Sequence, residues 1–114
     1  MKFCDVFKSP ETEGKEKHVP VIEIEKGCQE GIDIVRVTVG KEVAHPNTIE
    51  HHIVWIELFG VKQNGQVVDI GRCDFGPTLS NPSVRFKVIA NDYRAFCALS
   101  YCNIHGVWQN CLDI

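Results

Sequence analysis

The chain has 114 residues, of which 44% are hydrophobic and 24% charged, and its formal net charge is −3. These values are ordinary for a soluble globular protein and suit a single domain over residues 1–114. The slight acidity gives no sign of binding to nucleic acid or to a membrane surface. No apolar run approaches the roughly 18 residues of a membrane span, and the first residues lack the apolar segment of a secretion signal. We therefore expect a cytoplasmic protein.

Valine and isoleucine far outnumber leucine and alanine, which favours strands over helices. Alternating hydrophobic residues, separated by turn signals such as Asn64-Gly65, predict seven strands: 19–26, 32–40, 50–61, 66–75, 84–90, 93–101 and 106–112. Seven short strands at this spacing predict an all-β fold, an antiparallel β-sandwich. No segment has a convincing helical period, and residues 8–17 are expected to form a polar, flexible loop.

The period of two also assigns residues to the faces of these strands. In the third strand, Ile56 and Leu58 share one face, and Ile53 is expected on the opposite one. In the sixth strand, Ser100 and Cys102 fall on the same face as a phenylalanine and an alanine.

The six cysteines contain no Cys-x-x-Cys pair, so neither a redox dithiol nor a zinc or iron–sulfur knuckle is indicated. Without an export signal we expect reduced thiols rather than disulfides. Cys73 and Cys97 are interpreted as buried free cysteines that act as small hydrophobic residues. The sequence assigns no role to Cys4, Cys28 or Cys111.

All five histidines fall in three short runs, and the last run adds a cysteine. His45 and His51 flank a Pro-Asn turn that allows both rings to reach one ion. His51 and His52 are neighbours on an expected strand and point to opposite faces, so only one of them is expected to bind. Cys102 and His105 form a Cys-x-x-His turn that presents sulfur and nitrogen together.

Imidazole nitrogens with one soft sulfur favour a transition metal. A blue-copper electron-transfer site is the alternative, but it uses two histidines, a cysteine and a weak axial ligand that is often methionine. The only methionine is Met1. A structural zinc site in a binding module is a second alternative, and it is usually closed, four-coordinate and rich in cysteine.

Three segments resemble one known family. Glu-Lys-His-Val-Pro, His-Pro-Asn-Thr-x-Glu-His-His-Ile and Ser-Tyr-Cys-Asn-x-His-Gly-x-Trp are similar to the three signatures of superoxide reductases, the neelaredoxin/desulfoferrodoxin family. The similarity runs in the same order from about Gly14 to Trp108. It implies an immunoglobulin-like β-sandwich. Because Cys4 is the only cysteine near the start, the chain resembles the one-iron, neelaredoxin-like class rather than the branch with a second iron domain.

The resemblance implies a mononuclear non-haem iron, Fe²⁺/Fe³⁺, with an axial sulfur from Cys102. The four nitrogen ligands would form a square plane: His18, His45, His51 and His105. Glu16 would close the sixth position in the ferric state, and Lys17 would stand above it as a cationic residue. His52 would not bind.

The implied reaction is the one-electron reduction of superoxide to hydrogen peroxide, with Glu16 and Lys17 as the catalytic residues. An external electron donor such as rubredoxin would restore the ferrous iron. The resemblance also favours a homo-oligomer, a tetramer.

Overall fold

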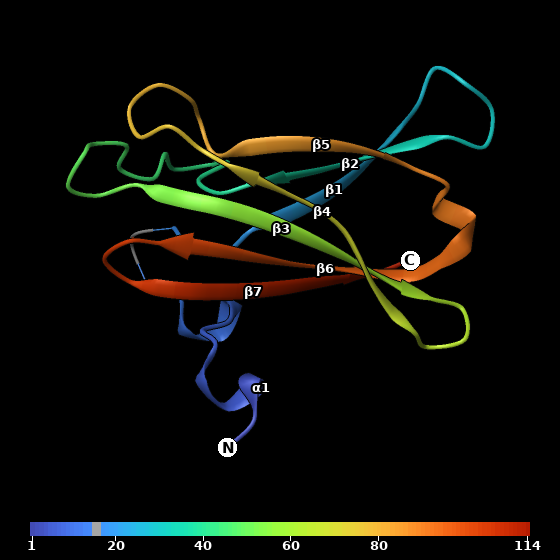
Figure 1. Cartoon of the computed structure of the whole chain (residues 1–114), viewed down its shortest axis with the longest axis horizontal. Helices are drawn as coiled ribbons and strands as arrows, with labels where there is room; N and C mark the ends of the chain where they lie inside the picture. Colours follow the sequence, from blue (N-terminus) through green and yellow to red (C-terminus); the bar gives the residue numbers. More distant parts are fainter. Residues whose placement is uncertain (15–16) are drawn as a thin grey trace.

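In the computed structural model, residues 1–14 and 17–114 are described, and they form two antiparallel sheets packed face to face (Figure 1). The three-stranded sheet has the order β1–β2–β5, with β1 at Val21–Lys26, β2 at Asp33–Thr38 and β5 at Ser83–Val88. The four-stranded sheet has the order β4–β3–β6–β7, with β3 at Ile53–Lys62, β4 at Val67–Asp74, β6 at Tyr93–Cys102 and β7 at Gly106–Asp113. The predicted seven-stranded antiparallel β-sandwich is confirmed.

The described helices are single turns, which the sequence did not predict. They are α1 at Phe3–Val6 and two 3-10 turns at Pro10–Thr12 and Ala90–Asp92. One turn is too short to show a helical period, and so the pattern of hydrophobic residues did not reveal these segments. The first 3-10 turn lies inside the stretch 8–17 that was expected to be an irregular loop. None of the described helices has the length and apolar character needed to cross a membrane.

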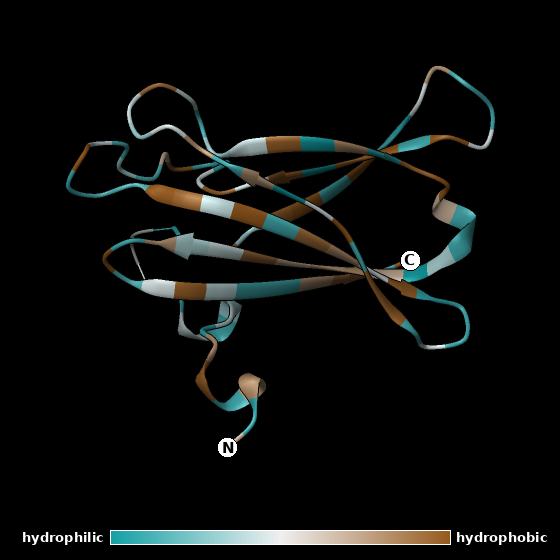
Figure 2. Ribbon diagram, in the orientation of Figure 1, coloured by the Kyte–Doolittle hydropathy of each residue, from teal (hydrophilic) through white to brown (hydrophobic). Residues whose placement is uncertain are grey.

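The core lies between the two sheets and comes from the alternating residues of the strands. Val35 and Val37 of β2 are completely buried, and so are Ile56 and Leu58 of β3 and Phe96 of β6. Figure 2 shows hydrophobic and hydrophilic residues alternating along several strands. The face that the period of two assigned to Ser100 and Cys102 in β6 is therefore confirmed.

The face assignment is wrong at the start of β3. Ile53 is 4% exposed and belongs to the same core cluster as Ile56 and Leu58, although alternation placed it on the opposite face. The pairing of β3 with β6 shifts its register between Ile53 and Trp55. An extra residue at such a bulge reverses the alternation on one side of it, so Ile53 turns to the core.

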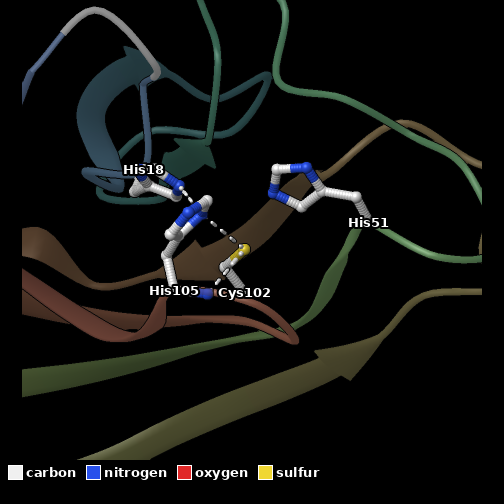
Figure 3. A group of neighbouring side chains, drawn as sticks. All are labelled: His18, His51, Cys102 and His105. Atoms are coloured by element: carbon white, nitrogen blue, oxygen red, sulfur yellow. Dashed lines mark hydrogen bonds between the residues drawn. The ribbon is translucent and has the colours of Figure 1, made fainter.

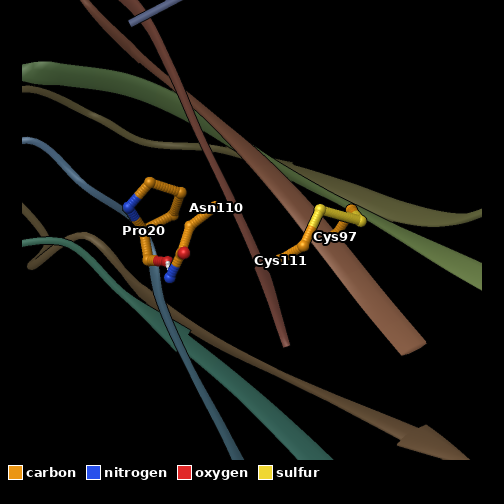
Figure 4. The surroundings of a disulfide bond; sticks show 4 residues. All are labelled: Pro20, Cys97, Asn110 and Cys111. Carbon is orange, nitrogen blue, oxygen red and sulfur yellow. Dashed lines mark hydrogen bonds between the residues drawn. A yellow bond between two sulfur atoms is a disulfide. The ribbon is translucent and has the colours of Figure 1, made fainter. Parts of the chain in front are cut away.

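The expectation of reduced thiols is wrong for one pair, because Cys97 and Cys111 form a disulfide (Figure 4). Cys97 stands directly opposite Cys111 in the β6–β7 pairing, with their Cα atoms 4.1 Å apart. Directly opposed residues of an antiparallel pair share one face, so the register brings the two sulfurs together. Cys97 is thus not a free cysteine. Cys73, expected to be buried, is half-buried with a free thiol.

Removal of the disulfide should destabilise the fold without preventing it. The bond closes a loop with a sequence separation of 14, for which the chain-entropy estimate is about 3 kcal/mol. We expect the double substitution Cys97→Ala, Cys111→Ala to lower the free energy of unfolding by about this amount in urea titrations. A Cys4→Ala, Cys28→Ala protein serves as the control. Titration of six free thiols in the denatured, unreduced protein would contradict the assignment.

Candidate metal centre

The histidine-bearing segments lie at one end of the sandwich (Figure 1). His18 comes just before β1, and His45 and His51 lie on the long connection between β2 and β3. Cys102 ends β6, and His105 lies in the tight turn that leads into β7. Because neighbouring strands of the four-stranded sheet run antiparallel, the start of β3 meets the end of β6 and the start of β7.

Four imidazole rings form a closed, four-sided arrangement. The ring centroids of His18 and His45 are 5.0 Å apart, those of His45 and His51 4.9 Å, those of His51 and His105 5.1 Å, and those of His105 and His18 4.8 Å. Neighbouring rings cross at 63° to 82°, so they meet edge to face rather than in a stack. The four sides are nearly equal, and the rings therefore surround one common point.

The sulfur atom of Cys102 lies beside the four imidazoles. The candidate ligand atoms of His18, His51, Cys102 and His105 all lie within 4.8 Å of one another (Figure 3). Cys102 is completely buried. The backbone N–H of His105 donates to its Sγ at 3.4 Å, as expected for a Cys-x-x-His turn. Gly106 ends this turn with a φ of 85°, a conformation that favours glycine.

His45 takes part in the ring of imidazoles but not in this group of four. Its side chain is 6% exposed, and its Nδ1 lies 2.7 Å from the carbonyl oxygen of Pro46. An Nδ1–H that donates to a backbone carbonyl fixes the ring and is typical of histidines that bind metal through the other nitrogen.

The other candidate residues divide into three cases. The Nδ1 of His52 lies 3.0 Å from the carbonyl oxygen of Thr48, and His52 is not in the group, so only His51 of the adjacent pair joins the cluster. Both residues precede β3, which begins at Ile53. The ammonium of Lys17 lies 3.5 Å from the carboxylate of Glu13. Glu16 falls outside the described residues.

The donor set and its spacing fit a transition metal ion. The Nε2 of His18 and the Nδ1 of His105 are 3.1 Å apart. Two nitrogens that bind one ion at about 2.1 Å and at right angles are separated by about 3 Å. Nitrogens with one sulfur suit iron, copper or zinc, and so the residues present fit the mononuclear iron that the sequence resemblance implies.

Two residues anchor the cluster although neither was identified as functional from the sequence. The buried hydroxyl of Ser100 donates to the carbonyl oxygen of His18 at 2.8 Å. Asn103 accepts from the backbone N–H of His52 at 2.9 Å and donates to the carbonyl oxygen of Glu50 at 2.9 Å. Two features of the sequence could have identified them. Ser100 is a polar residue on the inward face of β6, and Asn103 lies inside the Cys-x-x-His turn.

The ring of Trp108 supports His18 from behind. The two rings are stacked, with centroids 4.7 Å apart and an angle of 10°, and Trp108 is 4% exposed. The ammonium of Lys8 lies 5.4 Å from the centroid of the indole. The backbone of Lys8 also bonds to Val107 and Gln109 on either side of Trp108. The N-terminal segment is thereby held against the metal-site end of β7.

A cavity of about 310 Å³ adjoins His45 and contains charged groups that compensate one another. The ammonium of Lys41 lies 2.6 Å from the carboxylate of Glu23, and Arg36 lies 3.3 Å from the same carboxylate. A hydrogen bond from Lys41, together with the charges of Lys41 and Arg36, holds the pKa of Glu23 below its ordinary value. These cations are therefore engaged within the protein.

The fold and the donor set together define a metal-binding β-sandwich protein, and comparison with known proteins gives its family. The sequence profile of desulfoferrodoxin matches residues 10–111. A superoxide reductase of Pyrococcus abyssi is 48% identical over 112 residues, covering 93% of each chain. The neelaredoxin of Megalodesulfovibrio gigas is 35% identical over 124 residues, covering 96% of this chain and 95% of its own.

Solved structures agree with the sequence comparison. A crystal structure of an oxidised superoxide reductase superimposes with a TM-score of 0.84 at 38% identity, covering 99% of both chains. A neelaredoxin-type superoxide reductase of Ignicoccus hospitalis gives a TM-score of 0.84 at 33% identity, covering 100% of this chain and 98% of its own. The chain belongs to the desulfoferrodoxin family, and several of the similar solved structures are neelaredoxin-type superoxide reductases.

Loss of the indole behind His18 should loosen the metal site. Trp108→Ala leaves a cavity that costs about 3–5 kcal/mol and removes the support of the imidazole. We expect this variant to lose iron to a chelator faster than the wild type. Trp108→Phe keeps an aromatic ring and should lie between the two. Equal rates of iron loss from wild type and Trp108→Ala would show that the stacked ring does not hold His18.

Proposed function

We propose that this chain is a superoxide reductase, an oxidoreductase that converts superoxide to hydrogen peroxide by adding one electron and two protons. The observation that carries the proposal is the closed ring of four imidazoles next to a buried cysteine sulfur, in a chain of the desulfoferrodoxin family. Similar proteins of Pyrococcus horikoshii and Thermococcus kodakarensis are also named superoxide reductase, which supports the same activity.

The proposed iron ligands are five side chains. Four would be nitrogens of the histidine ring, His18, His45, His51 and His105, and the fifth would be the sulfur of Cys102. Since the Nδ1 of His45 faces the carbonyl of Pro46, Nε2 is the proposed ligand atom there. The Nδ1 of His105 faces both Cys102 and His18 and is the proposed ligand atom of that ring. When bound, the iron supplies the electron and an open position for a small anion.

The residues around Cys102 prepare the sulfur for this role. The amide of His105 donates to Sγ, and such a hydrogen bond stabilises negative charge on a metal-bound sulfur and tunes the potential of the centre. Complete burial of the side chain keeps water away from the sulfur. Superoxide would therefore approach the cluster from a side other than that of Cys102.

Attraction of superoxide has to be local, because the whole chain carries a net charge of −3. Lys17 is the proposed source, since it directly precedes the ligand His18 and 39% of its side chain is exposed. A fixed cation near the site raises the local anion concentration and the association rate. Glu16 is proposed, from the family resemblance alone, to occupy the open position after the reaction.

The electron has to be returned by a partner. We propose a small one-electron carrier such as rubredoxin, and a cytoplasmic location where such carriers operate. Blue-copper electron transfer is not favoured, because the only methionine is the fully exposed Met1 and is unsuited to an axial position. Structural zinc is not favoured either, because five candidate donors exceed a closed tetrahedral set.

We further propose that the chain forms a homo-oligomer, a tetramer, through the outer face of the four-stranded sheet. Trp55 and Tyr101 stand opposite each other there, with ring centroids 5.8 Å apart, and Arg72 lies over the indole at 4.8 Å. Half-buried Phe59 and Leu99 extend the surface. Tryptophan, tyrosine and arginine are the residues that most often dominate protein–protein interfaces.

The enzymatic proposal is tested with iron-loaded protein. We expect about one iron per chain and a rapid second-order reaction of the ferrous form with superoxide in stopped-flow experiments. Lys17→Ala should slow that reaction about three- to tenfold at low ionic strength and flatten its salt dependence. Lys87→Ala, which removes an exposed charge from β5, serves as the control. A ferrous protein that does not react with superoxide would refute the activity, and an unchanged salt dependence would refute the role of Lys17.

The oligomer is tested separately by sedimentation velocity. Trp55→Glu introduces a charge at the centre of the proposed interface and should reduce the mass of the particle. Leu79→Glu changes an 87% exposed loop residue and should leave the mass unchanged. A monomeric wild type, or an unchanged mass for Trp55→Glu, would contradict the proposed interface.

A further inference from the structure

The carboxylate of Glu13 contacts both the backbone at His18 and the side chain of Lys17. One oxygen, Oε2, accepts from the backbone N–H of His18 at 3.1 Å and from that of Val19 at 2.7 Å. The other oxygen, Oε1, lies 3.5 Å from the ammonium of Lys17. The side chain is 18% exposed, so these interactions are partly shielded from water.

The first pair of contacts fixes the backbone at His18. β1 begins at Val21, so the N–H groups of His18 and Val19 lie before its ladder. Both residues are buried, and a buried N–H without an acceptor is costly. Glu13 supplies that acceptor, while Ser100 donates to the carbonyl oxygen of His18. The segment is therefore held from both directions at the residue that carries the imidazole.

The contact through Oε1 pairs Glu13 with the ammonium of Lys17. The ammonium of Lys17 also donates to the carbonyl oxygen of Gly14 at 3.3 Å. Glu13 and Lys17 line a common cavity of about 190 Å³ together with Glu42 and Lys41. A carboxylate at this distance partly cancels the field of the ammonium.

We propose that Glu13 is a positioning residue that fixes the backbone at His18 and restrains the ammonium of Lys17. The inference about Lys17 rests on the proposed function. Glu13 thereby sets how strongly the charge of Lys17 attracts an incoming anion. Release of Lys17 from Glu13 strengthens anion binding, provided that the backbone anchor at His18 is kept.

Two substitutions separate the anchor from the charge. Glu13→Gln keeps an oxygen that accepts from both N–H groups but removes the negative charge. Glu13→Ala removes both. Amide hydrogen exchange of the iron-loaded protein, measured on a peptide containing His18 and Val19, should be at least about fivefold faster in Glu13→Ala and close to wild type in Glu13→Gln. Unchanged exchange in Glu13→Ala would overturn the anchoring role.

Azide, a small anion, is the probe for the charge. We expect Glu13→Gln to bind azide about threefold more tightly than wild type at low ionic strength and to react correspondingly faster with superoxide. The matched control is Glu42→Gln, which removes a charge from the same cavity and should have a smaller effect. In a Lys17→Ala background, the Glu13→Gln effect should fall to the size of the control.

Equal effects of Glu13→Gln and Glu42→Gln, or an undiminished effect without Lys17, would overturn the restraint of Lys17. The exchange and azide measurements do not depend on turnover. A protein that shows the expected exchange and azide results but does not reduce superoxide would therefore refute the proposed function and leave the positioning role of Glu13 intact.

Discussion

The structure depends on the convergence of four imidazoles and one buried sulfur at a single end of the sandwich. The four histidines lie outside the strands. Hydrogen bonds other than those of the strand ladders therefore have to hold their backbones in place. The long connection between β2 and β3 is tied to the Cys102 turn through Asn103. The segment before β1 is tied to β6 through Ser100. Two of the anchors thus lie on β6 and in the turn that follows it.

Strand β6 also carries the disulfide, five residues before Cys102. A strand that slips by one residue turns every side chain to the other face. The Cys97–Cys111 bond fixes the pairing of β6 with β7 in the same register that places Cys102 opposite Gly106. The covalent bond and the sulfur of Cys102 are therefore parts of one ladder. The bond faces away from the core, and Cys102 faces into it.

Several charged side chains near the cluster lie in ion pairs. Arg36 and Lys41, near His45, are both engaged with Glu23, and Lys17 is engaged with Glu13. On the outer sheet face, a hydrogen bond with Asp69, together with burial, raises the pKa of Glu57 above its ordinary value. In an acidic chain, a site that attracts an anion needs a cation whose charge is only partly neutralised by its carboxylate partner. Lys17, 3.5 Å from the carboxylate of Glu13, fits that requirement better than Lys41, which lies 2.6 Å from the carboxylate of Glu23.

The sequence by itself determined the order of the strands along the chain, the faces of residues away from the β3 bulge, and the grouping of histidines with a cysteine as candidate metal ligands. These follow from local rules: a period of two, turn residues, and histidines concentrated in three short runs. Only the tertiary structure decided which distant residues meet. The Cys97–Cys111 bond depends on the register between two strands, and the inward turn of Ile53 depends on a bulge. The stacking of Trp108 on His18 and the contacts of Glu13 depend on how loops close over the sheet ends. No period in the sequence relates the residues that make these contacts. Only the packing of the chain determines them.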